Sequence, residues 1–176
     1  MVRIMCLSGH RKYPMGSLNP EIQKKSMEIM EKAIKLADNL GVRTIQLAGY
    51  DVYYEDSTEE TKKMFLKNLI KATQIASEYG MILGFETMEN DFMNTVEKAM
   101  KYVTLTGSAY LNVYPDLGNI TNAAKTYKDD VLDDLELSKC HIVSMHLKET
   151  VPGKFREIPF GTGHVNFEEG IKKPGI

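Results

Sequence analysis

Short apolar runs alternate with longer amphipathic stretches along the whole chain. Five runs are bounded by polar or helix-ending residues and have the length of strands buried on both faces, as in a parallel sheet. The five predicted strands are Val2–Leu7, Val42–Leu47, Met81–Glu86, Tyr110–Pro115 and His141–Met145. Their starts are about 30 to 40 residues apart, which is the spacing of repeated βα units. The pattern predicts an α/β protein with a parallel sheet and right-handed crossovers.

The stretches between the strands carry helix signals. Asn19 and Pro20 are typical of a helix start, and Gly41 is typical of a helix end. A capping box of Ser57 and Glu60 predicts the start of the second helix. Each helix has one apolar face that would cover the sheet. The positions expected to be buried along the first helix are Ile22, Ile29, Ala33, Leu36, Ala37 and Leu40.

The second half of the chain has weaker helix signals. One helix is predicted to end at Gly107, and another spans about Lys125–Ser138 with Tyr127 facing inward. Between His146 and a short predicted last helix, Phe167–Lys173, the chain is rich in Gly and Pro. Loops of this length in compact domains are usually either functional or disordered.

Composition limits the class of protein. The chain has 176 residues, of which 43% are hydrophobic, enough for one globular domain over residues 1–176. A net charge of −2 without a basic block argues against nucleic-acid binding. No apolar run approaches the roughly 20 residues that span a membrane, and the polar start does not resemble a signal peptide. Cys6 and Cys140 fall in predicted strands and are expected to be reduced core residues, which predicts a cytoplasmic protein.

Three side chains that can bind a metal ion lie at the ends of three consecutive predicted strands. Glu86 ends one strand, Asp116 follows the next, and His146 follows the one after that. A single carboxylate at a strand end is most often paired with a lysine. Because the carboxyl ends of parallel strands meet at one edge of a sheet, the three side chains together predict a site for Mn²⁺, Mg²⁺ or Zn²⁺.

A polar loop follows the first predicted strand at the same end of the sheet. It contains His10, Arg11 and Lys12. Two interpretations of this loop are equally consistent with the residues. The cations neutralise a substrate phosphate, or they are simply solvated.

All these polar residues lie at one end of the predicted sheet, which is the pattern of a (β/α)₈ barrel. A closed barrel needs eight βα units and typically about 250 residues. Five units cannot close one. We therefore expect an incomplete TIM-barrel domain.

Six segments carry a resemblance to a known family: CLSGHRKYPMGS, RTIQLAGYDVYYED, FETMENDFMN, YPDLGN, HLKET and PGKFREIPFGTGHVNF. They resemble, in order and over nearly the whole chain, the L-xylulose-5-phosphate (L-ribulose-5-phosphate) 3-epimerase family. Some of its members are labelled hexulose-6-phosphate isomerases. These are sugar-phosphate enzymes of the xylose-isomerase-like barrel class. The resemblance implies that this chain corresponds to the middle of the enzyme, strands three to seven.

The resemblance also implies roles for individual residues. Glu86 matches a metal ligand that acts as one acid/base group, and Asp116 and His146 match two more ligands. The family's fourth ligand, a second acid/base glutamate, has no counterpart in this sequence. The residues implied to lie near the substrate's oxygens or phosphate are Glu89, Asn119, Arg156, His10 and Arg11.

The implied reaction interconverts L-xylulose 5-phosphate and L-ribulose 5-phosphate. A divalent metal ion would stabilise the enediolate that forms when the C3 proton is removed, and two carboxylates on opposite faces would exchange that proton. With only Glu86 available, one face lacks its acid. The alternatives are an aldose-ketose isomerase that uses the same metal and moves the proton between C1 and C2, and an inactive truncated fragment.

Two further expectations complete the interpretation. An endonuclease of the same superfamily would need more His and Glu ligands and a basic DNA-binding face, neither of which is apparent. An open sheet of five strands has two unpaired edges and uncovered apolar surface. We therefore expect the chain to form a homo-oligomer.

Overall fold

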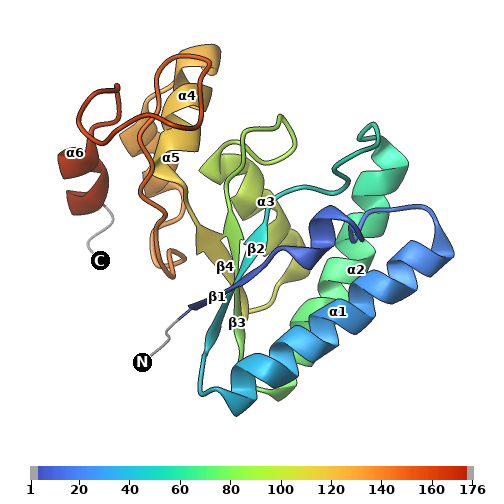
Figure 1. The fold of residues 1–176 in the computed structure, drawn as a ribbon. Helices are drawn as coiled ribbons and strands as arrows, with labels where there is room; N and C mark the ends of the chain where they lie inside the picture. The colour runs from blue at the N-terminus through green and yellow to red at the C-terminus, as the bar shows by residue number, and fades with distance from the viewer. Residues whose placement is uncertain (1–3, 174–176) are drawn as a thin grey trace.

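The computed structural model describes residues 4–173 and shows an α/β fold in which strands and helices alternate (Figure 1). The strands are β1 (Ile4–Leu7), β2 (Thr44–Ala48), β3 (Ile82–Glu86) and β4 (Leu111–Tyr114). The helices are the 3₁₀ turn η1 (Gly9–Arg11), α1 (Pro20–Asn39), α2 (Glu59–Glu78), α3 (Val96–Thr106), α4 (Leu117–Tyr127), α5 (Val131–Glu136) and α6 (Phe167–Lys172). The first two residues of the predicted strand Val2–Leu7 lie outside the described residues.

The four strands form one parallel sheet in the order β1-β2-β3-β4. Its register aligns Leu47 with Phe85 and Phe85 with Val113. It also pairs Ala48 with Glu86, so the strands end at one edge. Neighbouring parallel strands joined through helices confirm the predicted βα units and the incomplete (β/α)₈ barrel.

The predicted fifth strand, His141–Met145, is not a regular strand. The segment runs parallel to β4 but forms only two isolated bridges, Val113 with Ile142 and Asp116 with His146. Pro115 lies between these bridges and has no N–H, so it cannot donate the ladder bond that would link them. The His146 N–H still donates to the Pro115 carbonyl at 2.8 Å, which keeps His146 beside the end of β4.

The apolar core lies between one face of the sheet and helices α1, α2 and α3. Phe85 and Leu83 of β3 are fully buried there, and Phe65 of α2 stacks on Phe85 with ring centroids 5.9 Å apart. A second, smaller cluster joins α4, α5 and α6 around Leu117. The other face of the sheet is more exposed: Ile4 and Ile82 are only half-buried.

The predicted start of α1 is confirmed, whereas the predicted cap of α2 is wrong by one residue. The Asn19 side chain caps α1 and accepts a hydrogen bond from the Glu21 N–H. The capping box of α2 consists of Thr58 and Thr61, not of Ser57 and Glu60. Ser57 instead donates to Asp51, so its hydroxyl is not available to cap the helix.

Other predictions about packing were wrong in detail. Leu36 and Leu40 of α1 are exposed because the buried face of α1 is centred on Met30, Ile34 and Ala37. The flank that carries the two leucines therefore does not face the sheet.

The helix predicted over Lys125–Ser138 is two helices. Lys128 adopts a left-handed conformation with a φ of 62° and ends α4, and the Asp130 side chain then caps α5. Tyr127, expected to face inward, is 39% exposed, and its hydroxyl contacts the side chains of Asn94 and Lys98.

Neither cysteine is a core residue, contrary to the prediction. Cys6 lies in β1 but on the more exposed face of the sheet, and Cys140 lies in a turn with a φ of 66°. Both are free thiols. Within residues 4–173, no helix combines the length and apolar character needed to cross a bilayer.

Candidate metal and substrate site

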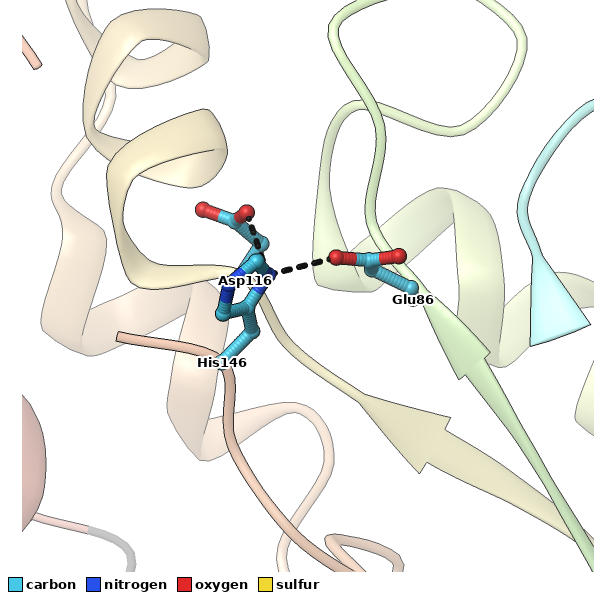
Figure 2. A group of neighbouring side chains, drawn as sticks. All are labelled: Glu86, Asp116 and His146. Carbon is cyan, nitrogen blue, oxygen red and sulfur yellow. Dashed lines mark hydrogen bonds and ion pairs between the residues drawn. The ribbon is translucent and has the colours of Figure 1, made fainter. Parts of the chain in front are cut away.

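Glu86, Asp116 and His146 converge at the carboxyl ends of the strands. Glu86 ends β3, Asp116 lies between β4 and α4, and His146 lies on the bridged segment beside β4. Figure 2 shows the imidazole of His146 next to both carboxylates. Its Nδ1 atom lies 2.7 Å from Glu86 Oε1 and 3.0 Å from Asp116 Oδ2. One ligand atom from each residue lies within 4.8 Å of the others, so a single cation can contact all three.

Asp116 is fully buried and held by its neighbours. Its Oδ1 atom accepts the Asn119 N–H at 2.9 Å as the cap of α4, and its own N–H donates to Thr87 Oγ1 at 2.9 Å. Its Oδ2 atom is also buried, and it lies 3.1 Å from Lys148 Nζ and 3.0 Å from His146 Nδ1. A buried carboxylate oxygen is costly unless a cation faces it.

The protonation of His146 follows from this geometry. Hydrogen bonds to Asp116 and Glu86 raise the pKa of His146 to about 10, although burial opposes the shift. The positive charge of the imidazolium therefore lies beside the two carboxylates, where a divalent ion would replace the proton. Two carboxylates and an imidazole are suitable ligands for Mn²⁺, Mg²⁺ or Zn²⁺. Because one ligand atom from each of the three residues lies within 4.8 Å of the others, they fit such an ion.

Lys148 is a site residue that the sequence analysis missed. Its ammonium donates to Asn119 Oδ1 at 2.6 Å and pairs with Asp116. The signal was present in the HLKET motif, because alternate residues of an extended segment lie on the same side and His146 is two positions earlier.

The predicted substrate residue Asn119 is buried at the start of α4. Its Nδ2 atom donates to the Thr87 carbonyl at 2.8 Å. Asn119 therefore contacts Asp116, Thr87 and Lys148, and it lies beside the candidate ligands. Thr87, which follows Glu86 directly, was also not predicted from the sequence.

Glu89 and Arg156 form an ion pair, and Glu89 lines a separate cavity with Tyr53. Arg156 is largely exposed and also reaches the Tyr53 hydroxyl. These two predicted substrate residues come together from segments far apart in the sequence. Their charges already neutralise each other in this arrangement.

His10 and Arg11 occupy different environments. The guanidinium of Arg11 lies over the Tyr53 ring, 4.7 Å from its centroid, and Arg11 lines the cavity that also contains Glu86. His10 is buried, and its Nε2 atom lies 3.2 Å from the Ser26 carbonyl of α1. Burial lowers the pKa of His10. The structure therefore places Arg11 at the candidate site and does not bring His10 there.

A cavity of about 280 Å³ opens beside the candidate ligands. Its wall contains Glu86 and His146 on one side and Arg11 on the other. Gln46 of β2 and Cys6 of β1 line it between these two sides. This volume is near the lower end of the range for pockets that take small molecules.

The Gly- and Pro-rich segment after Thr150 is ordered around a buried carboxylate. Glu149 accepts the N–H groups of Thr150 at 3.0 Å, Gly161 at 3.0 Å and Val165 at 3.2 Å. Burial would raise the pKa of Glu149, but these backbone hydrogen bonds lower it. The loop that carries Arg156 is therefore fixed to the segment that carries His146.

The fold and the site define this chain as part of a (β/α)₈ barrel with a carboxylate–imidazole site at its strand ends. The chain belongs to the xylose isomerase-like TIM barrel family, which matches residues 2–173. It is 40% identical over 174 residues to L-ribulose-5-phosphate 3-epimerase UlaE from Escherichia coli O139:H28 and from Escherichia fergusonii. That alignment includes 97% of this chain and 60% of each relative.

Solved structures share the fold at lower sequence identity. A D-tagatose 3-epimerase-like protein aligns with a TM-score of 0.82 at 20% identity, over 98% of this chain and 65% of its own. An L-ribulose 3-epimerase aligns with a TM-score of 0.77 at 18% identity, over 94% and 56% of the two chains. Like the curated relatives, both are longer than the part that this chain matches.

Proposed function

We propose that this chain belongs to a sugar-phosphate 3-epimerase that interconverts L-xylulose 5-phosphate and L-ribulose 5-phosphate. The observation that carries the proposal is the convergence of Glu86, His146 and the buried Oδ2 of Asp116 beside a small cavity. The curated relatives with the same activity in their names support the choice of substrate.

Glu86, Asp116 and His146 would hold a divalent metal ion such as Mn²⁺, Mg²⁺ or Zn²⁺. When bound, the ion would draw negative charge off the ketose oxygens as a Lewis acid. Asp116 cannot easily move, because the cap of α4 and Thr87 fix it. Such rigid placement of the ligands is what a preorganised site needs.

Glu86 is the proposed proton acceptor. Its side chain is 15% exposed and lines the cavity, so its second oxygen can approach a substrate carbon. Removal of the C3 proton by Glu86 gives a planar enediolate. Return of a proton to the same face regenerates the substrate, whereas inversion at C3 requires an acid on the opposite face. Glu86 alone is therefore sufficient for hydrogen exchange at C3 but not for epimerisation.

The polar residues around the cavity would orient the substrate. Lys148 and Asn119 lie next to Asp116 and would bind oxygens near the reacting carbons. Arg11 lines the cavity, and Arg156, which pairs with Glu89, lies beside Tyr53, whose ring Arg11 covers. Arginines suit a phosphate group. We extend the proposal to a cytoplasmic homo-oligomer.

The proposal is tested by NMR with the chain loaded with Mg²⁺ in D₂O. We expect L-ribulose 5-phosphate to exchange its C3 hydrogen for deuterium with retention at C3, because Glu86 acts from one face. Deuterium at C1 of the ketose would instead support the aldose-ketose isomerase. No exchange at any carbon would favour the fragment that binds but does not react.

Metal binding is measured separately by titration with Mn²⁺. Asp116→Asn should weaken binding by at least about 100-fold, more than the 10- to 100-fold typical of residues behind the ligands. Asp56→Asn is the matched control, because Asp56 is exposed and outside the site. Equal Mn²⁺ affinity of the two variants would overturn the assignment of Asp116 as a ligand.

A further inference from the structure

One row of polar side chains crosses the more exposed face of the sheet below the candidate metal ligands. The register pairs Cys6 of β1 with Gln46 of β2, and Gln46 with Gly84 of β3. The next row toward the strand ends pairs Ala48 with Glu86. Rows on one face are separated by two residues, or about 7 Å. Gln46 therefore lies at the floor of the cavity that Glu86 borders.

Gln46 is an unusual residue for its position. Its neighbours Ile45 and Leu47 point to the opposite face and belong to the apolar core, whereas Gln46 lines the cavity. The residue is only 8% exposed. Buried polar groups in folded proteins nearly always have hydrogen-bond partners.

The two ends of the Gln46 amide differ. Its Oε1 atom accepts a short hydrogen bond from the Cys6 thiol. Its Nε2 atom has no hydrogen-bond partner within residues 4–173 and remains accessible to solvent. Because Cys6 holds the oxygen, the N–H groups are available to the cavity. The Nε2 group of Gln46 can therefore donate a hydrogen bond to a ligand in the cavity.

The place of Gln46 in the sheet indicates which part of a ligand it meets. β2 lies between β3, which ends in Glu86, and β1, whose following turn carries Arg11. A ketose 5-phosphate with O2 and O3 at the candidate metal ligands and its phosphate toward Arg11 places C4 and C5 in between. Of these two carbons, only C4 carries a free hydroxyl.

We propose that Gln46 donates a hydrogen bond to the C4 hydroxyl of the ketose phosphate, and that Cys6 is the positioning residue that orients the Gln46 amide. The inference rests on the proposed function. It assigns to Gln46 the recognition of configuration at C4, a carbon that does not react. A ketose with the opposite configuration at C4 directs its hydroxyl away from the amide and does not gain this bond.

The test measures binding by calorimetry with the Mn²⁺-loaded chain. The ligands are L-ribulose 5-phosphate and D-xylulose 5-phosphate, which differ only in configuration at C4. The chain should bind L-ribulose 5-phosphate about 10-fold more tightly, which is the size expected for one neutral hydrogen bond. Gln46→Met keeps the side-chain length without the amide. It should lower the affinity for L-ribulose 5-phosphate about 10-fold, and so abolish the preference.

Several variants separate recognition from a structural role. Thr44→Val is the matched control, because Thr44 lies on the same face of β2 one row further from Glu86, and it should keep the preference. Cys6→Ser keeps a donor to the amide and should also keep it, whereas Cys6→Ala should reduce it. Gln46→Leu provides a second variant if Gln46→Met does not fold. Mn²⁺ affinity should be unchanged in all of them.

The outcomes distinguish this inference from the proposed function. If the loaded chain binds neither sugar phosphate, the proposed function is wrong and this inference is wrong with it. If the chain prefers L-ribulose 5-phosphate and Gln46→Met keeps that preference, the role of Gln46 is overturned while the proposed function stands. Equal binding of both sugars by the parent chain overturns the inference in the same way.

Discussion

The two faces of the sheet are built from alternate residues of the same strands, yet they differ in kind. Along β3, Leu83 and Phe85 point to the helices and are fully buried in apolar contacts. Gly84 and Glu86 point to the other face, where a side chain at position 84 would collide with Val143 at 2.8 Å. One face therefore stabilises the fold, and the other face carries Glu86 and borders the cavity.

This division explains why binding residues and core residues occur side by side in the sequence. A strand presents successive side chains to opposite faces, so a substitution at one position need not disturb its neighbour. Substitutions on the helix-facing side should change the free energy of unfolding. Substitutions on the cavity side should change the affinity for ligands.

Substitution of the adjacent residues Phe85 and Glu86 gives the strongest test of the division between the two faces. Phe85→Ala should lower the free energy of unfolding by about 3 to 5 kcal/mol, because it leaves a cavity between β3 and α2. Glu86→Gln should cost about 1 kcal/mol at most, since it removes one hydrogen bond to His146. Urea unfolding measures both.

The ligand measurement should give the opposite order. Glu86→Gln should abolish most Mn²⁺ binding, whereas the folded fraction of Phe85→Ala should bind Mn²⁺ normally. If Glu86→Gln were as destabilising as Phe85→Ala, the division between the two faces would be wrong.

A smaller effect is expected at Thr87, which should contribute both to stability and to metal binding. Thr87 is fully buried, and its hydroxyl accepts the Asp116 N–H. Thr87→Val keeps the shape but leaves that N–H unpaired, which should cost about 1 to 3 kcal/mol of stability. The freed Asp116 should also bind Mn²⁺ about 10-fold more weakly. Thr73→Val is the control, since the buried Thr73 hydroxyl bonds only within α2. Its Mn²⁺ affinity should not change.

Much of this division could be predicted from the sequence. Apolar runs and helix periodicity locate the core face because hydrophobic burial depends on residue type and spacing. The strand-end positions of Glu86, Asp116 and His146 were predicted for the same reason, since parallel strands end at one edge. The convergence of these three residues needed no knowledge of their contacts.

The contacts that orient side chains could not be predicted in this way. Whether Ser57 or Thr58 caps α2 depends on Asp51, which takes the Ser57 hydroxyl through a tertiary contact. Similarly, His10 and Arg11 are adjacent in sequence, but the turn η1 directs one into the protein and the other to the cavity. Periodicity does not determine which way a residue in a short turn points.

The smallest effect is expected at Glu149. This buried carboxylate is not a candidate metal ligand, and its partners are backbone N–H groups. These hydrogen bonds lower its pKa from the ordinary value of 4.5. A carboxylate with a lowered pKa in the folded state stabilises the fold above its unfolded pKa and loses that contribution as the pH falls. Glu149→Gln should therefore cost about 1 kcal/mol at neutral pH.

The pH dependence separates Glu149 from the carboxylates of the cavity. The difference in unfolding free energy between the parent and Glu149→Gln should be constant above about pH 5 and shrink as the pH falls below 4.5, the ordinary value. Urea unfolding at several pH values with EDTA present measures this difference without any contribution from metal. A difference that grows as the pH falls would contradict the lowered pKa of Glu149. It would mean that the loop carrying Arg156 is not held by an ionised Glu149.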